Sequence, residues 1–308
     1  MKRFILKTVI FLAILTAVDL AWGLAFDHIE SRIDIGGTGR NNYICNKVAD
    51  DIIILGSSRA ENHYNAQMIT DSLGLSCYNC GESGCGITLN YGRLLLLLER
   101  HTPKLIIYEI TPDFDYLKGN DTHKSLTLLK NYCNREGIDS IFQDYDKTER
   151  YKILSGLYRH NSSFLQNFVA FFLNISFSSG IKGFRPIDQE MDTIKIKKDY
   201  ICYDSKEGYD YDSLKLKYFN KFLNKTRDIE TILVVSPMWY GQDDTVLDTI
   251  KSLCSLRENI TLFNYSNSPK FNHNNLLFVN GTHLNAKGAD EFTRNLINDI
   301  RNKHIIPE

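Results

Sequence analysis

Hydrophobic residues along this chain fall into short continuous runs that alternate with longer amphipathic stretches. Most of the short runs are rich in β-branched residues, and the runs predict strands at 52–55, 75–81, 104–110, 231–237 and 260–266. Helical patterns lie between or after them at 65–73, 87–101, 244–257 and 286–302. Strands that alternate with helices predict a parallel sheet covered by helices on both faces. We therefore expect an α/β fold.

A long block in the middle of the chain, residues 120–228, interrupts this alternation. It is mainly polar and amphipathic, with helical patterns at 123–135, 148–174 and 212–227 and an irregular piece around 175–211. Such a block is too long for an ordinary crossover between neighbouring strands. We expect a helical insertion or cap on the sheet.

The chain opens with a mostly apolar run at residues 4–26, which is long enough to cross a bilayer, since a spanning helix needs about 20 residues. Lys2, Arg3 and Lys7 mark its N-terminal side, and basic residues favour the cytoplasmic side of a membrane. The run predicts a single-pass bacterial membrane protein with a cytoplasmic N-terminus and an extracytoplasmic body.

Asp19 interrupts this run, and a carboxylate near the middle of a membrane span is costly. It lies nearer the outer end, where it could reach the interface. A cleaved signal peptide and a buried core helix of a cytosolic protein are the alternatives to an anchor. We expect an anchor at 1–27, a polar connector at 28–50 and one folded domain at 51–308 that carries the insertion.

The composition of the chain bears on its binding partners but does not indicate a reaction. The 308 residues carry a net charge of -1, so nothing global favours nucleic acid. Three of the seven cysteines, Cys77, Cys80 and Cys85, lie close together, but no second ligand pair at matching spacing accompanies them. We expect buried thiols and no metal site, although an extracytoplasmic body would permit a disulfide.

Polar residues follow several predicted strands at their carboxyl ends, where parallel sheets bind ligands. Gly56-Ser57-Ser58 follows the first strand, and Ser58 there could be a nucleophile or only part of a turn or helix cap. His283 lies just before the last helix, which Asn285 could cap. A hydroxyl and an imidazole brought together are the minimal parts of an acyl-transfer site.

These pieces resemble the SGNH (GDSL-type) hydrolases. "ILGSSR", "NCGESG" and "NGTHLNAKG" are similar to three of that family's conserved blocks, over roughly 50–116 and 230–300. The resemblance implies a flavodoxin-like three-layer sandwich. It implies that Ser58 is the nucleophile, with Ser57 in the usual Asp place, and that His283 is the general base. It also implies that the backbone N–H groups of Ser58 and Gly84 form the oxyanion hole.

Two positions depart from the family pattern. Asp113 stands closest to the Asn that normally donates to the oxyanion, and an ionised carboxylate cannot donate. Asn280 stands where an Asp normally orients the His. An Asn side chain can still accept from the imidazole, but it cannot stabilise an imidazolium by charge. The site would then act as a Ser58–His283 dyad, react slowly, or have lost its activity.

The anchored form resembles the divergent branch of this family that handles cell-envelope polymers, the neighbourhood of the D-alanine transfer protein of teichoic acid synthesis and of alginate O-acetylation proteins. The resemblance implies a membrane-tethered serine esterase or O-acyltransferase acting on an acylated glycan or envelope polymer, without a cofactor, beside a membrane-bound acyltransferase. We expect Arg59, Asp113 and Trp239 to contact the substrate, although Arg59 could instead form an internal ion pair, for example with Glu61, Glu82 or Asp113. We expect His63, although it is near Ser58 in the sequence, to be solvated. A silent glycan-binding or scaffold protein is the alternative. A nucleotide-binding domain is the weaker one, because no phosphate-binding motif is present.

Overall fold

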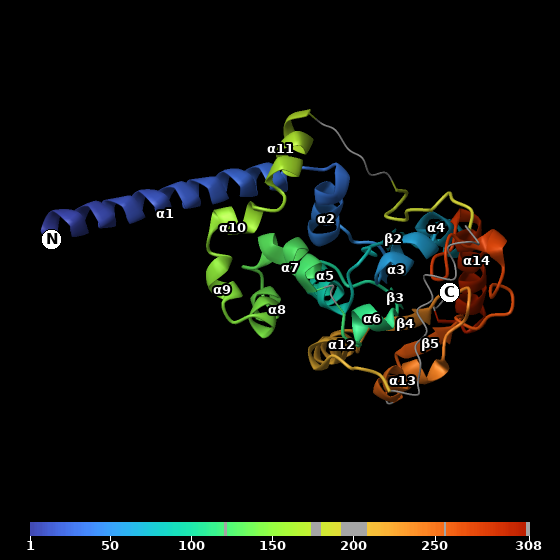
Figure 1. Cartoon of the computed structure of the whole chain (residues 1–308). Helices are drawn as coiled ribbons and strands as arrows, with labels where there is room; N and C mark the ends of the chain where they lie inside the picture. The colour runs from blue at the N-terminus through green and yellow to red at the C-terminus, as the bar shows by residue number, and fades with distance from the viewer. Residues whose placement is uncertain (120–121, 174–179, 192–207, 256, 306–308) are drawn as a thin grey trace. The chain divides into compact units, whose positions relative to one another are not determined.

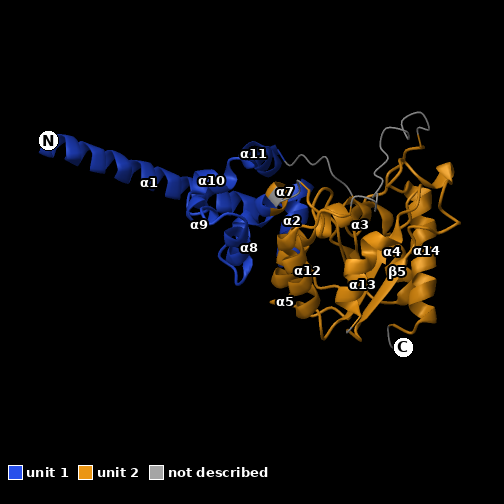
Figure 2. Ribbon diagram, turned by 60° about the horizontal axis from the view of Figure 1, so that its bottom comes forward, with its two compact units in different colours: residues 1–47, 126–179 blue, residues 48–125, 180–308 orange. Residues whose placement is uncertain are grey.

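The computed structural model describes residues 1–119, 122–173, 180–191, 208–255 and 257–305. The chain divides into two compact units (Figure 2). Unit 1 contains residues 1–47 and 126–179, and unit 2 contains residues 48–125 and 180–308.

Unit 2 is built on a five-stranded parallel sheet in the order β2-β1-β3-β4-β5 (Figure 1). The strands are β1 (Ile52–Leu55), β2 (Cys77–Asn79), β3 (Leu105–Glu109), β4 (Glu230–Val235) and β5 (Ile260–Asn264). This order is one of the two common doubly wound arrangements and is the order of flavodoxin. The α/β fold predicted from the sequence is confirmed.

The helices of unit 2 follow the predicted alternation closely. They are α3 (Ser58–His63), α4 (Ala66–Leu73), α5 (Ile87–Leu98), α6 (Pro112–Asp115), α12 (Ser213–Lys225), α13 (Asp248–Cys254) and α14 (Ala286–Asn302), with short 3-10 turns at Asp244–Leu247 and Asn275–Leu277. α7 (Thr122–Leu129) crosses the boundary between the units.

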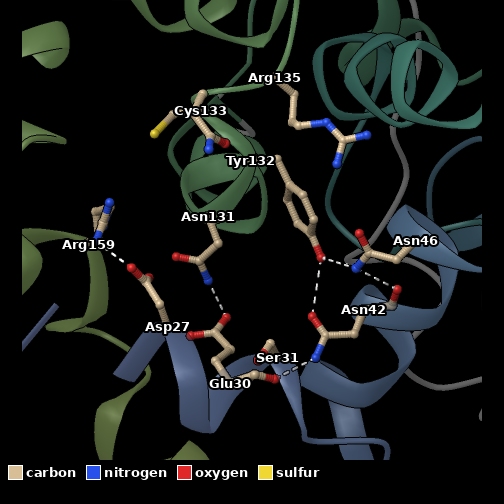
Figure 3. Close-up of a pocket in the computed structure, with 11 residues that line it drawn as sticks. Asp27, Glu30, Ser31, Asn42, Asn46, Asn131, Tyr132, Cys133, Arg135 and Arg159 are labelled. Carbon is tan, nitrogen blue, oxygen red and sulfur yellow. Dashed lines mark hydrogen bonds and ion pairs between the residues drawn. The ribbon is translucent and has the colours of Figure 1, made fainter. Parts of the chain in front are cut away.

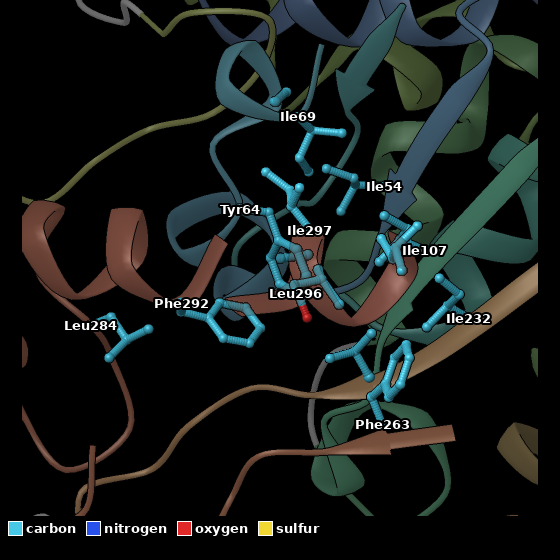
Figure 4. Packing of buried hydrophobic residues seen from close by; sticks show 14 of the residues in the cluster. Ile54, Tyr64, Ile69, Ile107, Ile232, Phe263, Leu284, Phe292, Leu296 and Ile297 are labelled. Atoms are coloured by element: carbon cyan, nitrogen blue, oxygen red, sulfur yellow. The ribbon is translucent and has the colours of Figure 1, made fainter. Parts of the chain in front are cut away.

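The core of unit 2 lies on both faces of the sheet, because each central strand is buried on both sides. Ile54, Ile107 and Ile232 face α4 and α14, and Phe292 and Leu296 of α14 pack among them (Figure 4). On the other face the ring of Tyr108 packs against Phe219 and Phe222 of α12. Burying each such side chain contributes roughly 1.5–3 kcal/mol.

Unit 1 is helical. It contains α1 (Lys2–Ser31), α2 (Gly36–Asn46), the end of α7, a 3-10 turn (Lys130–Tyr132), α8 (Ile138–Tyr145), α9 (Glu149–Lys152), α10 (Gly156–His160) and α11 (Phe164–Leu173). The segment 28–50, predicted as a connector, therefore holds the end of α1 and all of α2. The helix predicted at 148–174 is three shorter helices, because the Ser155 side chain caps a new start at α10 by accepting from Tyr158 N.

Within the part of the chain that the structure describes, α1 alone is long and apolar enough to cross a membrane. Its apolar side chains from Phe4 to Leu20 are largely exposed. In Figures 1 and 2 its first turns extend beyond the other helices of unit 1.

Candidate active site

A sharp turn after β1 presents Ser58. Gly56 has φ +139°, and a Cβ there would lie 2.8 Å from the carbonyl oxygen of Glu109, so only glycine fits. Ser57 is the N-cap of α3, and its Oγ lies 2.8 Å from Thr111 Oγ1 at the end of β3. Ser58 is the first residue of α3 and remains partly exposed.

A short loop before α14 presents His283. The backbone N–H of Val279 donates to the carbonyl of His283 at 2.8 Å, and Phe278 and Leu284 form an antiparallel bridge. The Asn285 side chain caps α14 by accepting from Gly288 N at 2.9 Å. The loop is therefore fixed on both sides of the imidazole.

The two loops place Ser58 Oγ 2.8 Å from His283 Nε2. The other ring nitrogen, Nδ1, lies 3.2 Å from Asn280 Oδ1 and 3.1 Å from Thr282 Oγ1. An amide oxygen can only accept, so these contacts place the proton on Nδ1. Nε2 is then free to accept the proton of Ser58.

The surroundings keep His283 neutral. Burial and, to a smaller extent, the nearby Arg59 guanidinium lower the pKa of its imidazole to about 4. A neutral imidazole is available as a base near pH 7. The side chains that contact its ring, those of Ser58, Thr282 and Asn280, carry no carboxylate that would stabilise the imidazolium.

Asn280 shapes the loop as well as facing the ring. Its Oδ1 accepts from the backbone N–H groups of Thr282 and His283, at 3.0 and 2.9 Å. One side chain therefore sets both the backbone and the tautomer of His283.

The turn after β2, which carries Gly84, is held directly against the Ser58 turn. Glu82 N donates to the carbonyl of Gly56 at 3.0 Å, and Gly84 has φ +70°. Ser83 N donates to a carboxylate oxygen of Glu61 in α3 at 3.1 Å. At the start of α3 the N–H of Ser58 has no partner within the helix.

Beneath the two loops lies a buried polar network that the sequence did not reveal. The Arg59 guanidinium pairs with Glu109 at 2.8 Å and donates to the carbonyl of Ser236 at 2.6 Å. Arg59 is 4% exposed and Glu109 is fully buried, so Arg59 forms the internal pair rather than facing a ligand. The expected partners were Glu61, Glu82 or Asp113. The actual partner, Glu109, has its pKa raised by burial and lowered less by Arg59.

His63 is part of the same network, and the expectation that it is solvated is wrong. The last turn of α3 carries it into the core, where it is 0% exposed. Its Nε2 accepts from Leu284 N at 3.0 Å, so its Nδ1–H donates to Ser236 Oγ at 2.8 Å. Ser236 Oγ in turn donates to Glu109 at 2.9 Å. His63 therefore holds the backbone next to His283.

One signal for this network was present in the sequence. Glu109 ends an otherwise apolar strand, and a carboxylate there must be paired if it is buried. Its partners depend on how β3, β4 and α3 pack together. The spacing of residues along the chain does not predict this packing.

The other two expected substrate residues lie near the rim of the sheet. Asp113 is the second residue of α6, is partly exposed, and accepts on its backbone carbonyl from Lys215 Nζ at 2.6 Å. Trp239 follows β4, and its backbone N–H donates to Gly281 O at 3.0 Å, which places it beside the His283 loop. Its indole N–H donates to Asn275 at 2.8 Å.

The clustered cysteines Cys77, Cys80 and Cys85 are buried and do not form disulfides. Burial raises the pKa of Cys85 to about 11. Among the described residues, His, Cys, Asp and Glu side chains form no group of three or more that would hold a metal. Cys202 lies outside the described residues.

Unit 1 contains a separate polar pocket of about 410 Å³. In Figure 3, Asp27 pairs with Arg159, Asn131 donates to Glu30, and the Tyr132 hydroxyl reaches Asn42. Its lining residues are Asp27, Glu30, Ser31, Asn42, Asn46, Asn131, Tyr132, Cys133, Asn134, Arg135 and Arg159. None of the residues expected to act in catalysis lines it.

Comparison with known proteins gives no family. No family model matches the chain, and no curated protein matches it significantly. Among solved structures it is similar to a Streptococcus pneumonia protein described provisionally as a platelet activating factor, with 12% identity over 96% of this chain and 98% of that chain and a TM-score of 0.36.

It is also similar to two esterases. A family two carbohydrate esterase from Clostridium thermocellum is 13% identical with a TM-score of 0.35, and an acetyl xylan esterase from Butyrivibrio proteoclasticus is 10% identical with a TM-score of 0.34. Both matches cover 82% of this chain and 63% of the esterase chain. TM-scores of this size establish neither fold nor activity, so both rest on the geometry of this chain.

Proposed function

We propose that this protein is a membrane-tethered serine esterase or O-acyltransferase that acts on an acyl ester of a cell-envelope glycan or polymer. Ser58 is the nucleophile and His283 is its base. The observation that carries the proposal is the 2.8 Å contact between Ser58 Oγ and an unprotonated His283 Nε2. The two residues are 225 positions apart in the sequence, so two independently built loops must meet to make this contact.

The chemistry follows from these two groups. His283 Nε2 takes the Ser58 proton while Oγ attacks the carbonyl carbon of the ester. The protonated imidazole then gives that proton to the departing alcohol, which leaves an acyl group on Ser58. Water or a sugar hydroxyl, activated by the same imidazole, takes the acyl group and restores the serine.

The tetrahedral intermediate carries a negative oxygen that needs donors. The N–H groups of Ser58 and Gly84 are the donors that we propose, because hydrogen bonds join the turn after β2 to Gly56 and to α3. Asp113 cannot supply a third donor while it is ionised.

A glycan substrate is supported by the aromatic side chains beside the His283 loop. The Tyr240 ring lies 3.6 Å from where a Cβ on Gly281 would be, and Trp239 stands against it with ring centroids 4.5 Å apart. Both rings are partly exposed. An amphipathic ring at the edge of a polar site suits the apolar face of a sugar.

The tether and the envelope location are supported by α1 and by the basic residues in its first two turns. An acyl donor on the other side of that membrane would need a membrane-bound acyltransferase as a partner.

Replacing the nucleophile tests the proposal directly. The purified full chain in detergent should hydrolyse a chromogenic acetate ester, and Ser58→Ala should lower kcat about 10²-fold or more. A fluorophosphonate should label Ser58 and fail to label the variant. Ser57→Ala is the matched control, because its hydroxyl contacts Thr111 rather than His283 and labelling at position 58 should persist. Undiminished turnover in Ser58→Ala would refute the assignment.

A silent glycan-binding protein is the second candidate, and the neutral amide of Asn280 favours it. Without a carboxylate the imidazolium is poorly stabilised, which in a serine protease lowers turnover by about 10⁴. Folded protein that binds an acylated glycan but is never labelled at Ser58 would identify this candidate.

A further inference from the structure

Helix α11 in unit 1 buries a polar side chain and exposes apolar ones, the reverse of a helix on a surface that faces water. Its one buried residue is Asn167, whose amide contacts Glu30 at 3.0 Å and Thr38 at 2.6 Å. Its exposed side chains are mostly apolar and include Phe164, Leu165, Phe168, Phe172 and Leu173. A helix that buries its amide and exposes phenylalanine is suited to an apolar environment.

The start of α10 is fixed to the apolar part of α1 by Asp19. The Asp19 carboxylate accepts from Ser155 Oγ at 2.8 Å, from Gly156 N at 3.1 Å and from Leu157 N at 2.9 Å. This carboxylate therefore satisfies the free N–H groups at the start of a second helix. A charge that is costly in an apolar helix has a structural partner here.

The two helices also approach very closely at this point. A Cβ added to Gly156 would lie 2.4 Å from Gly23 Cα, so neither position leaves room for a side chain. Contact through small residues is the way helices pack in membranes, where the hydrophobic effect does not drive association.

Further contacts hold α10 and α11 along the last turns of α1. The Trp22, Phe26 and Phe164 rings form one cluster, with Trp22 and Phe164 centroids 6.1 Å apart and Phe26 and Phe164 centroids 6.3 Å apart. The His160 ring contacts Asp27 at 2.9 Å and Glu30 at 3.1 Å. Both figures of the whole chain show α10 and α11 beside this end of α1.

The position of Asp19 along α1 sets the depth at which the start of α10 lies in the membrane. At about 1.5 Å per residue, Asp19 lies roughly 10 Å before Phe26, the end of the apolar run. Residues at the start of α10 lie beside it, and the exposed Leu154 and Leu157 flank that point. Interfacial helices bury their apolar face about 5–10 Å into a bilayer.

We infer that the start of α10 and the exposed face of α11 lie in the outer interfacial layer of the membrane that α1 spans. The inference rests on the tether of the proposed function, and it adds a second, monotopic contact to the single spanning helix. The lipid bilayer covers the exposed apolar surface of α10 and α11, because this surface is continuous with the exposed apolar surface of α1. A single helix would leave unit 1 free to rotate, whereas two contacts fix which face of unit 1 is turned to the lipid.

Depth-dependent fluorescence quenching tests this contact. The full chain, with Trp22→Phe, Trp239→Phe and Phe168→Trp, is placed singly in nanodiscs. Phosphatidylcholine that carries bromine on the acyl chain near the headgroup should lower the tryptophan emission about twofold relative to unbrominated lipid. Leu276→Trp is the control, because Leu276 is 71% exposed in unit 2 and should not be quenched.

Phe11→Trp, within α1 and in place of Phe168→Trp, separates failure of the inference from failure of the tether. Quenching at 11 without quenching at 168 would overturn the inference and leave the tether standing. Quenching at neither position would remove both. Because each nanodisc holds one chain, blue-shifted but unquenched emission at 168 would mean that protein covers this surface, which also overturns the inference.

Discussion

Asn280 faces Nδ1 of His283, the proposed base for Ser58. Its amide oxygen already selects the correct tautomer of His283, which distinguishes it from an Asn whose NH₂ faces the ring. What the amide cannot supply is negative charge next to a developing imidazolium. The residue therefore orients the base without strengthening it.

Asn280→Asp should raise both the basicity of His283 and the rate. An opposite charge within hydrogen-bond distance raises a histidine pKa by about 1–3 units, so the acid limb of the kcat/KM profile should move upward from near pH 4. Turnover near pH 7 should rise about tenfold. The pH dependence of ester hydrolysis measures both effects.

The matched control is Asn280→Ala, which removes the oxygen that accepts from Thr282 N and His283 N. It should lower turnover without moving the acid limb upward. An unchanged acid limb in Asn280→Asp would mean that position 280 does not act on the imidazole.

The element formed by β1, its turn and α3 carries Ser58, the proposed nucleophile, and it depends on a single glycine. Gly56 combines a positive φ with close contact to the end of β3, so the turn and the neighbouring strand fit only without a side chain. The sequence predicted that a turn follows residue 55. The reason for the glycine, its contact with Glu109, became visible only when β3 was placed beside β1.

Gly56→Ala should therefore destabilise the protein by more than about 3 kcal/mol and remove ester hydrolysis, because both backbone strain and overpacking act at this position. Gly74→Ala is the matched control. Gly74 also has a positive φ, +70°, but nothing lies within 4 Å of its added Cβ. It should cost only about 1 kcal/mol and leave hydrolysis intact.

Urea unfolding of both variants measures the loss of stability, and ester hydrolysis shows whether Ser58 is displaced. Together they distinguish backbone strain alone from strain with displacement of Ser58. Equal losses of stability in the two variants would show that the contact with β3 is not tight.

Across the whole of unit 2, the network of Arg59, Glu109, Ser236 and His63 joins the carboxyl ends of β3 and β4 to the loop of His283. His63 must be neutral here, because its Nε2 accepts from a backbone N–H. Burial, then the nearby His283 and Arg59, lower its pKa well below the usual value. Protonation would break the contact that holds Leu284.

The stability of unit 2 should therefore fall as the pH falls below about 6.5. In the unfolded chain His63 and His283 bind protons near that pH, whereas in the folded protein both pKa values are lower. The unfolded state then binds more protons, and each histidine contributes a loss of about 1.4 kcal/mol per pH unit. Glu109 acts in the opposite direction at lower pH, because burial raises its pKa, so the slope is clearest between about pH 6 and 5.

Urea unfolding of the full chain in detergent, followed by Trp239 emission with Trp22→Phe, measures this slope. His63→Gln should reduce it by about 1.4 kcal/mol per pH unit. His123→Gln, at an exposed position, should not change it. A slope that His63→Gln leaves unchanged would mean that His63 is not buried neutral.

The sequence by itself determined the alternation of strands and helices in unit 2, because burial on both faces requires continuous apolar strands and amphipathic helices. The predicted strand at 52–55 and the predicted helix at 286–302 match β1 and α14 at both ends. It also pointed to Ser58, His283 and Asn280 as a group through a resemblance in three short motifs. In each case the signal was local, within one run or motif.

Only the tertiary structure decided which polar groups meet. The pairing of Arg59 with Glu109, the contact of His63 with Leu284 and the capping of α10 by Asp19 each join residues at least 50 positions apart. Such contacts depend on how strands and helices cross, and apolar periodicity specifies which face of an element is buried but not what lies opposite it. For that reason a histidine expected in solvent became part of the core, and a carboxylate that interrupted an apolar helix acquired the start of another helix as its partner.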